Sequence, residues 1–152
     1  MDKDTVIITL GGAVVVCAMA LVVYLMALRP MMESGGGGER ESVYGVAEEF
    51  VNALTDGDVQ RAWQGMAPAY RQAVSLSRFQ AAVTSNPQLA SLRGATMGEY
   101  VRRGDAATLT GTLDSAGGRL PAELHLARRD DQWYMVEVIL AGRPALPSAA
   151  GD

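Results

Sequence analysis

The feature that most constrains this chain is an apolar run near its start, Thr5–Leu28 (TVIITLGGAVVVCAMALVVYLMAL), which holds no charged residue. At a rise of 1.5 Å per residue, a helix of this length extends roughly 36 Å, enough to cross a hydrocarbon core of about 30 Å. Arg29 and Pro30 end the run. The sequence therefore predicts a transmembrane anchor over residues 1–29, with the lipid bilayer contacted through residues 5–28.

A cleaved signal peptide is the main alternative to this anchor. Signal peptides have an apolar region of about 7–15 residues, with a basic stretch before it and a small-residue cleavage site after it. Here the run is longer, Lys3 stands between two aspartates, and Arg-Pro-Met-Met follows. A lipoprotein signal centred on Cys17 does not fit either, because Val16 stands where a small residue belongs. We therefore expect the anchor to remain uncleaved.

We predict the orientation in the membrane from the position of the anchor, because the charges on its two sides do not distinguish them. Lys3 lies before the run, and Arg29 and Arg40 lie after it, so the positive-inside rule favours neither side. An N-terminal anchor with so short a leading tail usually exports the rest of the chain. We expect a single-pass protein whose C-terminal domain lies outside the cytoplasm.

Charge and residue counts exclude several kinds of site. The net charge of −4 offers no basic face, so we expect no nucleic-acid partner. Cys17 is the only cysteine, which excludes a disulfide within the chain and a cysteine zinc site. His125 is the only histidine, and together with Glu123 it provides too few ligands for a metal. We predict no metal and no cofactor.

The rest of the chain divides into three parts. Residues 30–41 are predicted to be a flexible linker, because the stretch ESGGGGE has no apolar residue to bury. Residues 142–152 (GRPALPSAAGD) are predicted to be a disordered tail. About 100 residues remain between them, over 42–141, enough for one small core.

Helical spacing of apolar residues marks the first half of this domain and predicts three helices. The first contains Phe50 and ends at the glycine exit Gly57. Asp58 can cap the second, and Ser75 can cap the third, which ends at Asn86-Pro87.

After Leu92 the apolar period shortens to two, which predicts a four-stranded antiparallel sheet. The strand signals are Met97–Arg102, the alternation around Thr108, Thr110 and Thr112, the stretch around Leu124, and Trp133–Leu140. Gly and Asp turns separate the strands. The fold class is therefore α+β, with three helices packed on one face of the sheet.

The last strand suggests an interaction surface. Its inward set is predicted to be Tyr134, Val136, Val138 and Leu140. The alternating residues then lie on the outer face and form a candidate interaction face: Trp133, Met135 and Ile139. Exposed apolar groups of this kind mark partner or dimer surfaces, unless the tail or the first strand covers them.

Three stretches carry a resemblance to a known superfamily: FVNALTDGDVQRAW (50–63), SLSRFQAAVTSNP (75–87) and DDQWYMVEVIL (130–140). With their order of elements they resemble the NTF2-like (cystatin-like) superfamily, in particular small membrane-anchored bacterial domains of unknown function. The stretch NPQLASLRG, the sheet after it and the anchor also resemble bacterial relatives of cytochrome oxidase assembly factors.

The resemblance implies a fold but transfers no catalytic residue. Ketosteroid isomerases of the superfamily use a cone-shaped pocket with an aspartate base and a tyrosine donor. In this chain all the aspartates of the predicted domain fall at predicted turns or caps. They are Asp56, Asp58, Asp105, Asp114, Asp130 and Asp131. We predict no catalytic residue.

The function predicted from these features is a membrane-tethered, non-enzymatic protein-interaction module. It would bind a second copy of itself as a homodimer, or a partner in a membrane complex. Two alternatives stay open at this point. One is an apolar small-ligand binder or residual enzyme that uses the cone, and the other is an assembly factor for a membrane respiratory complex.

Overall fold

The computed structural model describes residues 37–149. The predicted anchor over 1–29 lies outside the described residues. Within 37–149, no helix combines the length and the apolar character needed to cross a membrane. The chain divides into two units between Gly38 and Glu39, and the unit that starts at Glu39 contains the folded domain.

Helices come first in this domain and strands follow. The helices are α2 (Gly37–Thr55), α3 (Val59–Gln64), α4 (Pro68–Ala73), α5 (Leu76–Ser85) and α6 (Pro87–Ala90). The strands are β1 (Leu92–Arg103), β2 (Ala106–Ser115), β3 (Gly118–Arg129), β4 (Gln132–Leu140) and β5 (Arg143–Pro144). They form one antiparallel sheet in chain order, β1-β2-β3-β4-β5.

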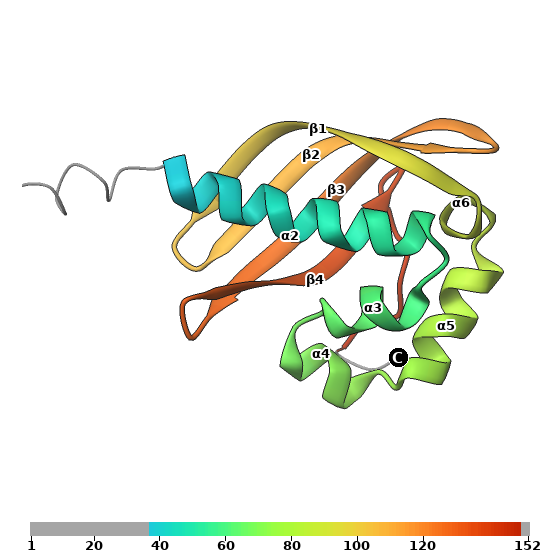
Figure 1. Ribbon diagram of the computed structural model, residues 1–152, viewed down its shortest axis with the longest axis horizontal. Coiled ribbons are helices and arrows are strands. Elements are labelled where there is room, and N and C mark those ends of the chain that lie inside the picture. Colours follow the sequence, from blue (N-terminus) through green and yellow to red (C-terminus); the bar gives the residue numbers. More distant parts are fainter. Residues whose placement is uncertain (1–36, 150–152) are drawn as a thin grey trace, which may run out of the picture. The chain divides into compact units, whose positions relative to one another are not determined.

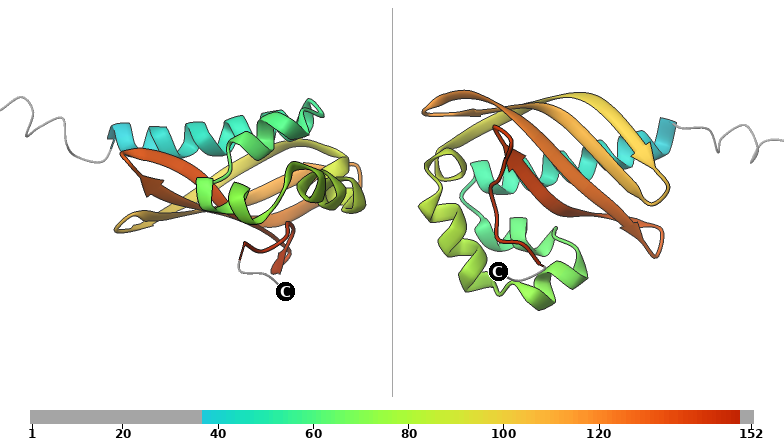
Figure 2. Two further views of the ribbon diagram at one scale, coloured as in Figure 1. Left: turned by 90° about the horizontal axis from the view of Figure 1, so that it is seen from below. Right: turned by 180° about the vertical axis from the view of Figure 1, so that it is seen from behind.

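The helices and the sheet form two layers. Figure 1 shows α2 lying across one face of the sheet, with α3, α4 and α5 grouped beside its β4 edge. Figure 2, seen from behind, shows the other face of the sheet without a helix over it. The predicted α+β class with helices on one sheet face is confirmed, and the sheet has a fifth, two-residue strand that was not predicted.

The predicted helix boundaries rest on side-chain caps that the structure shows. The Asp58 carboxylate accepts a hydrogen bond from the Arg61 backbone N–H at 3.0 Å, and the Ser75 hydroxyl accepts one from Arg78 N–H at 3.3 Å. Gly57 leaves α2 with a φ of 76°, a conformation that glycine adopts without strain. Pro87, which was expected to end the third helix, instead begins the short helix α6, and Pro68 begins α4 in the same way, because proline fits the first helical position.

The linker prediction is wrong over residues 37–41, where α2 has already begun. Glu39, in the first turn, forms ion pairs with Arg102 of β1 and Arg128 of β3. A carboxylate near a helix N-terminus is also favoured by the helix dipole. These contacts give the glycine-rich start of α2 a partner in the sheet, which composition alone does not indicate.

The core fills the space between α2, the shorter helices and the inner face of the sheet. Its largest fully buried side chains are Met66, Phe79, Leu89, Leu109, Leu124, Leu126 and Met135. Within the described chain, Ser115 is the one polar residue buried with them. At Gly111 of β2 a Cβ atom would overlap the Thr96 carbonyl oxygen of β1, so this position requires glycine.

The predicted interaction face is wrong for two of its three residues. Trp133 is 5% exposed and Met135 is fully buried, and both belong to the core. The cause is a β-bulge: His125 pairs with Glu137 and Leu126 pairs with Met135, so Val136 is an extra residue in β4. One extra residue reverses the side-chain alternation, so the inward set is Trp133 and Met135 before the bulge and Val138 and Leu140 after it.

The tail prediction is wrong over its first residues. Leu140 pairs with Arg143 across the two-residue turn Ala141-Gly142, whose φ values of 50° and 78° are both positive, as a type I′ turn requires. The chain is then held by a hydrogen bond from Ala145 N–H to the Val138 carbonyl oxygen at 2.8 Å. Leu146 joins the core, which explains why this segment is ordered.

Candidate functional site

The interior between α2 and the inner sheet face is lined by apolar side chains. Met66, Leu109 and Met135 are completely buried there. Among the described residues no aspartate or glutamate is buried, and a carboxylate general base depends on burial for its raised pKa. The aspartates lie at caps, turns and surface ion pairs: Asp58 caps α3, and Asp105 and Asp114 pair with Arg128 and Arg119.

Besides Ser115, the Tyr70 hydroxyl also reaches the interior. Tyr70 of α4 is 3% exposed, packs edge-on against the Phe79 ring at 6.3 Å, and its hydroxyl has no hydrogen-bond partner within the described chain. Burial raises the pKa of Tyr70 to about 12, and the positive charge of Arg78 acts in the opposite direction. The phenol therefore stays protonated at neutral pH. No carboxylate among residues 37–149 is buried with it.

The outer sheet face is polar. Of the predicted interaction face, Ile139 alone lies here, paired with Glu123 of β3. His125 stands between two glutamates, with Nδ1 3.2 Å from a Glu137 carboxylate oxygen and Nε2 3.4 Å from a Glu123 carboxylate oxygen. Over residues 37–149 no group of three or more His, Cys, Asp or Glu residues is arranged to hold a metal ion.

Two grooves border α2. One, of about 540 Å³, runs between α2 and β1, where the Tyr44 hydroxyl donates to the Gly98 carbonyl oxygen at 2.8 Å. The other, of about 350 Å³, lies where α2, α3 and β4 meet, and its lining includes Gly45, Gly65 and the largely buried Phe50 and Trp133. Both are shaped mainly by the packing of α2 against its neighbours.

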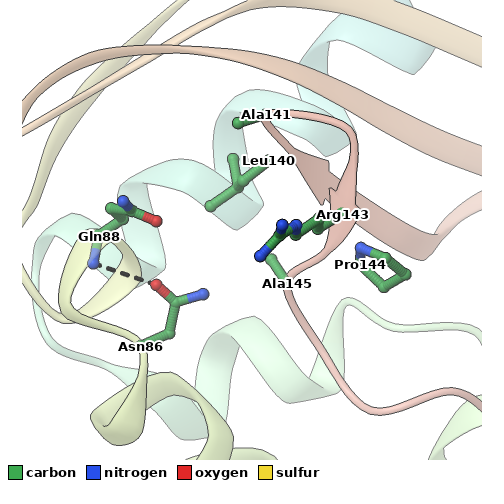
Figure 3. A pocket seen from close by; sticks show the side chains of 7 residues that line it. All are labelled: Asn86, Gln88, Leu140, Ala141, Arg143, Pro144 and Ala145. Atoms are coloured by element: carbon green, nitrogen blue, oxygen red, sulfur yellow. Dashed lines mark hydrogen bonds between the residues drawn. The ribbon is translucent and has the colours of Figure 1, made fainter.

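A third cavity, of about 480 Å³, brings together chain segments that are more than fifty residues apart. It lies between the junction of α5 with α6 and the β4–β5 turn (Figure 3). We call it the α6–β5 cavity. Its lining residues are Asn86, Gln88, Leu140, Ala141, Arg143, Pro144 and Ala145. Its volume falls within the range of roughly 300–1,000 Å³ that is typical of small-ligand pockets. It is open to solvent on the side formed by Gln88, Arg143 and Pro144, which are all exposed.

The orientation of the Asn86 side chain follows from helix capping. Its Oδ1 accepts a hydrogen bond from the Gln88 backbone N–H at 3.1 Å, as an N-cap residue does. Because this bond fixes the oxygen toward the helix, the NH₂ group is left to point away from it. In Figure 3 this nitrogen lies on the side of the cavity that faces Arg143.

Arg143 enters the same cavity from the opposite wall. Figure 3 shows its guanidinium group directed across the cavity toward Asn86 and Gln88. Its backbone is placed by the pairing of β5 with β4 and by the bond from Ala141 N–H to the Pro121 carbonyl oxygen at 2.9 Å. None of the ion pairs formed within residues 37–149 includes Arg143.

The α6–β5 cavity is therefore a wall of hydrogen-bond donors over an apolar floor. Arg143 supplies the one formal charge in its lining, and Asn86 and Gln88 add neutral amides. Leu140, Pro144 and Ala145 supply the apolar surface. This combination can bind an anionic group attached to a short apolar body, and it contains neither a nucleophile nor a base.

Sequence reasoning missed this cavity because it assigned each wall to another role. Asn86 was predicted only as a helix end, and Arg143 fell inside the predicted disordered tail. The available signal was the pair Ala141-Gly142 directly after an apolar strand, since a two-residue turn containing glycine predicts a hairpin. Alanine is unusual in the first position of such a turn, so the hairpin was not predicted.

Comparison with known proteins gives similar structures and no close relative. No protein-family model matches the chain, and no curated protein sequence matches it. An NTF2-like protein of unknown function from Shewanella oneidensis is 18% identical over 64% of this chain and 93% of its own, with a TM-score of 0.49. A DUF4783 family protein from Bacteroides ovatus is 15% identical over 60% of this chain and 90% of its own, with a TM-score of 0.44.

A second NTF2-like protein of unknown function, from Cytophaga hutchinsonii, is 10% identical over 62% of this chain and 86% of its own, with a TM-score of 0.42. The names of the NTF2-like neighbours coincide with the superfamily that the sequence resembles. Likeness at these identities concerns the fold alone.

Proposed function

We propose that this protein is a membrane-tethered, non-enzymatic protein-interaction module. Its anchor is the uncharged run over residues 5–28, and its folded domain lies outside the cytoplasm. The observation that carries the proposal is the apolar interior: Leu109, Leu124 and Met135 are completely buried in it, and no carboxylate of the described residues is buried with them. The groups that recognise a partner then lie on the surface.

The proposal is also supported by the small amount of apolar side-chain surface that the domain exposes. Within the described chain the exposed large apolar residues are Val101 and Val136, at 40% and 37% exposure. This is too little apolar area for an obligate interface, which is typically more hydrophobic than the rest of a protein surface. We therefore propose reversible binding of a partner through polar and mixed surfaces.

Purification of the tagged full chain in mild detergent tests this function. We expect a partner protein, or a second copy of this chain, to be retained at a fixed stoichiometry. Two controls show whether the folded domain is responsible. One is residues 1–36 fused to an unrelated domain, and the other is Leu124→Asp, which places a charge in the core and disrupts the fold.

Retention by the wild type and loss in both controls would support the module. Equal retention of the partner by the fusion that carries only residues 1–36 would assign the interaction to the anchor and contradict the proposal. A fusion of an export-dependent reporter after Asp152 tests the orientation separately. An inactive export reporter beside an active cytoplasmic one would place the domain in the cytoplasm.

A further inference from the structure

We propose that the α6–β5 cavity is a binding site for a carboxylate group carried on a short apolar body. The inference goes beyond the proposed function, because it identifies a specific site and its ligand chemistry and does not depend on what the rest of the surface binds. It rests on three features of the cavity: its donors, its charge and its fixed walls.

The donors converge from two walls. The Arg143 guanidinium presents planar N–H groups that match the two oxygens of a carboxylate. The Asn86 NH₂ group faces it across the cavity, because the hydrogen bond to Gln88 N–H engages the amide oxygen. Gln88 adds a second side-chain amide to the lining. An anion placed between the walls meets donors from both sides.

The charge of the site selects the kind of anion. Arg143 is the only charged residue that lines the cavity. One guanidinium balances a single negative charge, which suits a carboxylate better than a dianionic phosphate. The chain as a whole is acidic, with a net charge of −4, so a more highly charged anion would be repelled at longer range.

The walls are held in place before any ligand binds. Ala141 has a φ of 50°, an uncommon conformation for a residue other than glycine, asparagine or aspartate. It is kept there by its bond to the Pro121 carbonyl oxygen and by the bond from Ala145 N–H to Val138 on the far side of the turn. The backbone of Arg143, between these two hydrogen bonds, has little freedom to lose on binding, and its exposed side chain is the part that a ligand would order.

The floor defines the rest of the ligand. Leu140, Pro144 and Ala145 form an apolar surface beside the donors. A carboxylate on a small aliphatic group can contact both, and two sources provide this chemistry. One is the C-terminal residue of a peptide, and the other is a free short-chain monocarboxylate.

The test uses the ¹⁵N-labelled full chain in mild detergent, followed by NMR through the side-chain N–H signals of Asn86 and Arg143. Three probes are titrated: an acetylated peptide ending in Ala-Ala-Leu with a free carboxylate, the same peptide with an amidated C-terminus, and butyrate. We expect saturable shifts of both signals with at least one carboxylate and none with the amide.

Two substitutions make the test specific. Arg143→Gln should weaken carboxylate binding at least about tenfold, because it removes a charge-assisted hydrogen bond. Asn86→Asp keeps a good helix cap but replaces the NH₂ donor with a negative charge, so it should abolish binding with the fold intact. Arg129→Gln is the matched control, because it removes an exposed positive charge outside the cavity and should leave binding unchanged.

Comparison of the peptide with butyrate also identifies which kind of molecule supplies the carboxylate. Tighter binding of the peptide than of butyrate supports a protein C-terminus, and equal or tighter binding of butyrate supports a small metabolite. The proposal is overturned if neither carboxylate gives saturable shifts. It is also overturned if Arg143→Gln and Arg129→Gln weaken binding equally, or if inorganic phosphate binds more tightly than both carboxylates. None of these results depends on whether a membrane partner co-purifies.

Discussion

Tyr70 is a side chain whose hydroxyl group is not explained by its packing. The ring contributes to the core against Phe79, but the hydroxyl finds no partner within the described chain. A buried unpaired polar group costs about 1–3 kcal/mol, and deleting it can be neutral or stabilising. We predict that Tyr70→Phe leaves the free energy of unfolding unchanged or raises it by up to about 1 kcal/mol. Denaturant unfolding followed by tryptophan fluorescence measures this, and a loss above about 1 kcal/mol would reveal a hydrogen-bonding partner for the hydroxyl.

The raised pKa of the same residue predicts how stability depends on alkaline pH. Unfolding returns the Tyr70 pKa from about 12 toward 10.0. Between these values the unfolded chain releases the phenol proton and the folded chain retains it, so the folded state loses stability as pH rises from about 10 toward 12. We predict a steeper loss in the wild type than in Tyr70→Phe. Parallel curves for the two proteins over this range would contradict the burial of the hydroxyl.

At the scale of elements, β4 shows that one extra residue in a strand can move its side chains to the opposite face of the sheet. The strand was predicted in the right place, but every side chain before the bulge at Val136 points to the opposite face from the one predicted. We predict that Trp133→Ala costs about 3–5 kcal/mol of stability, as removal of a buried aromatic side chain does. Ile139→Ala is the matched control on the outer face of the same strand and should cost clearly less. Equal losses in the two variants would mean that β4 has no bulge.

The elements also show what the sequence could provide. Helices capped by Asp58 and Ser75 and strands with alternating threonines were predictable, because each has a local signal that tertiary contacts do not override. The bulge was not, since WYMVEVIL is apolar on both of its alternating faces apart from Glu137. The α6–β5 cavity was not predictable either. It depends on Asn86 and Arg143 being brought together by the whole fold.

At the scale of the whole molecule, ion pairs connect the sheet to the first turn of α2. Glu39 bridges Arg102 of β1 and Arg128 of β3, and Arg128 also pairs with Asp105 at 3.3 Å. These groups join the first turn of α2 to strands that follow it by more than sixty residues. The junction lies where the folded domain meets the part of the chain that leads to the predicted anchor. The strength of the Glu39 ion pairs therefore determines at which residue of α2 the folded domain begins.

Replacing Glu39 tests this junction. Isolated surface ion pairs contribute about 0–1 kcal/mol, and Glu39 joins two arginines in a partly exposed network, so Glu39→Gln should cost about 1 kcal/mol at low salt. The loss should shrink in 1 M salt, where the screening length falls to about 3 Å. Glu41→Gln is the matched control, because Glu41 is exposed and lies in the same helix. Amide hydrogen exchange should show earlier opening of residues 39–43 in Glu39→Gln alone. Unchanged exchange there would mean that packing of Val43, and not charge, holds the first turn of α2 on the sheet.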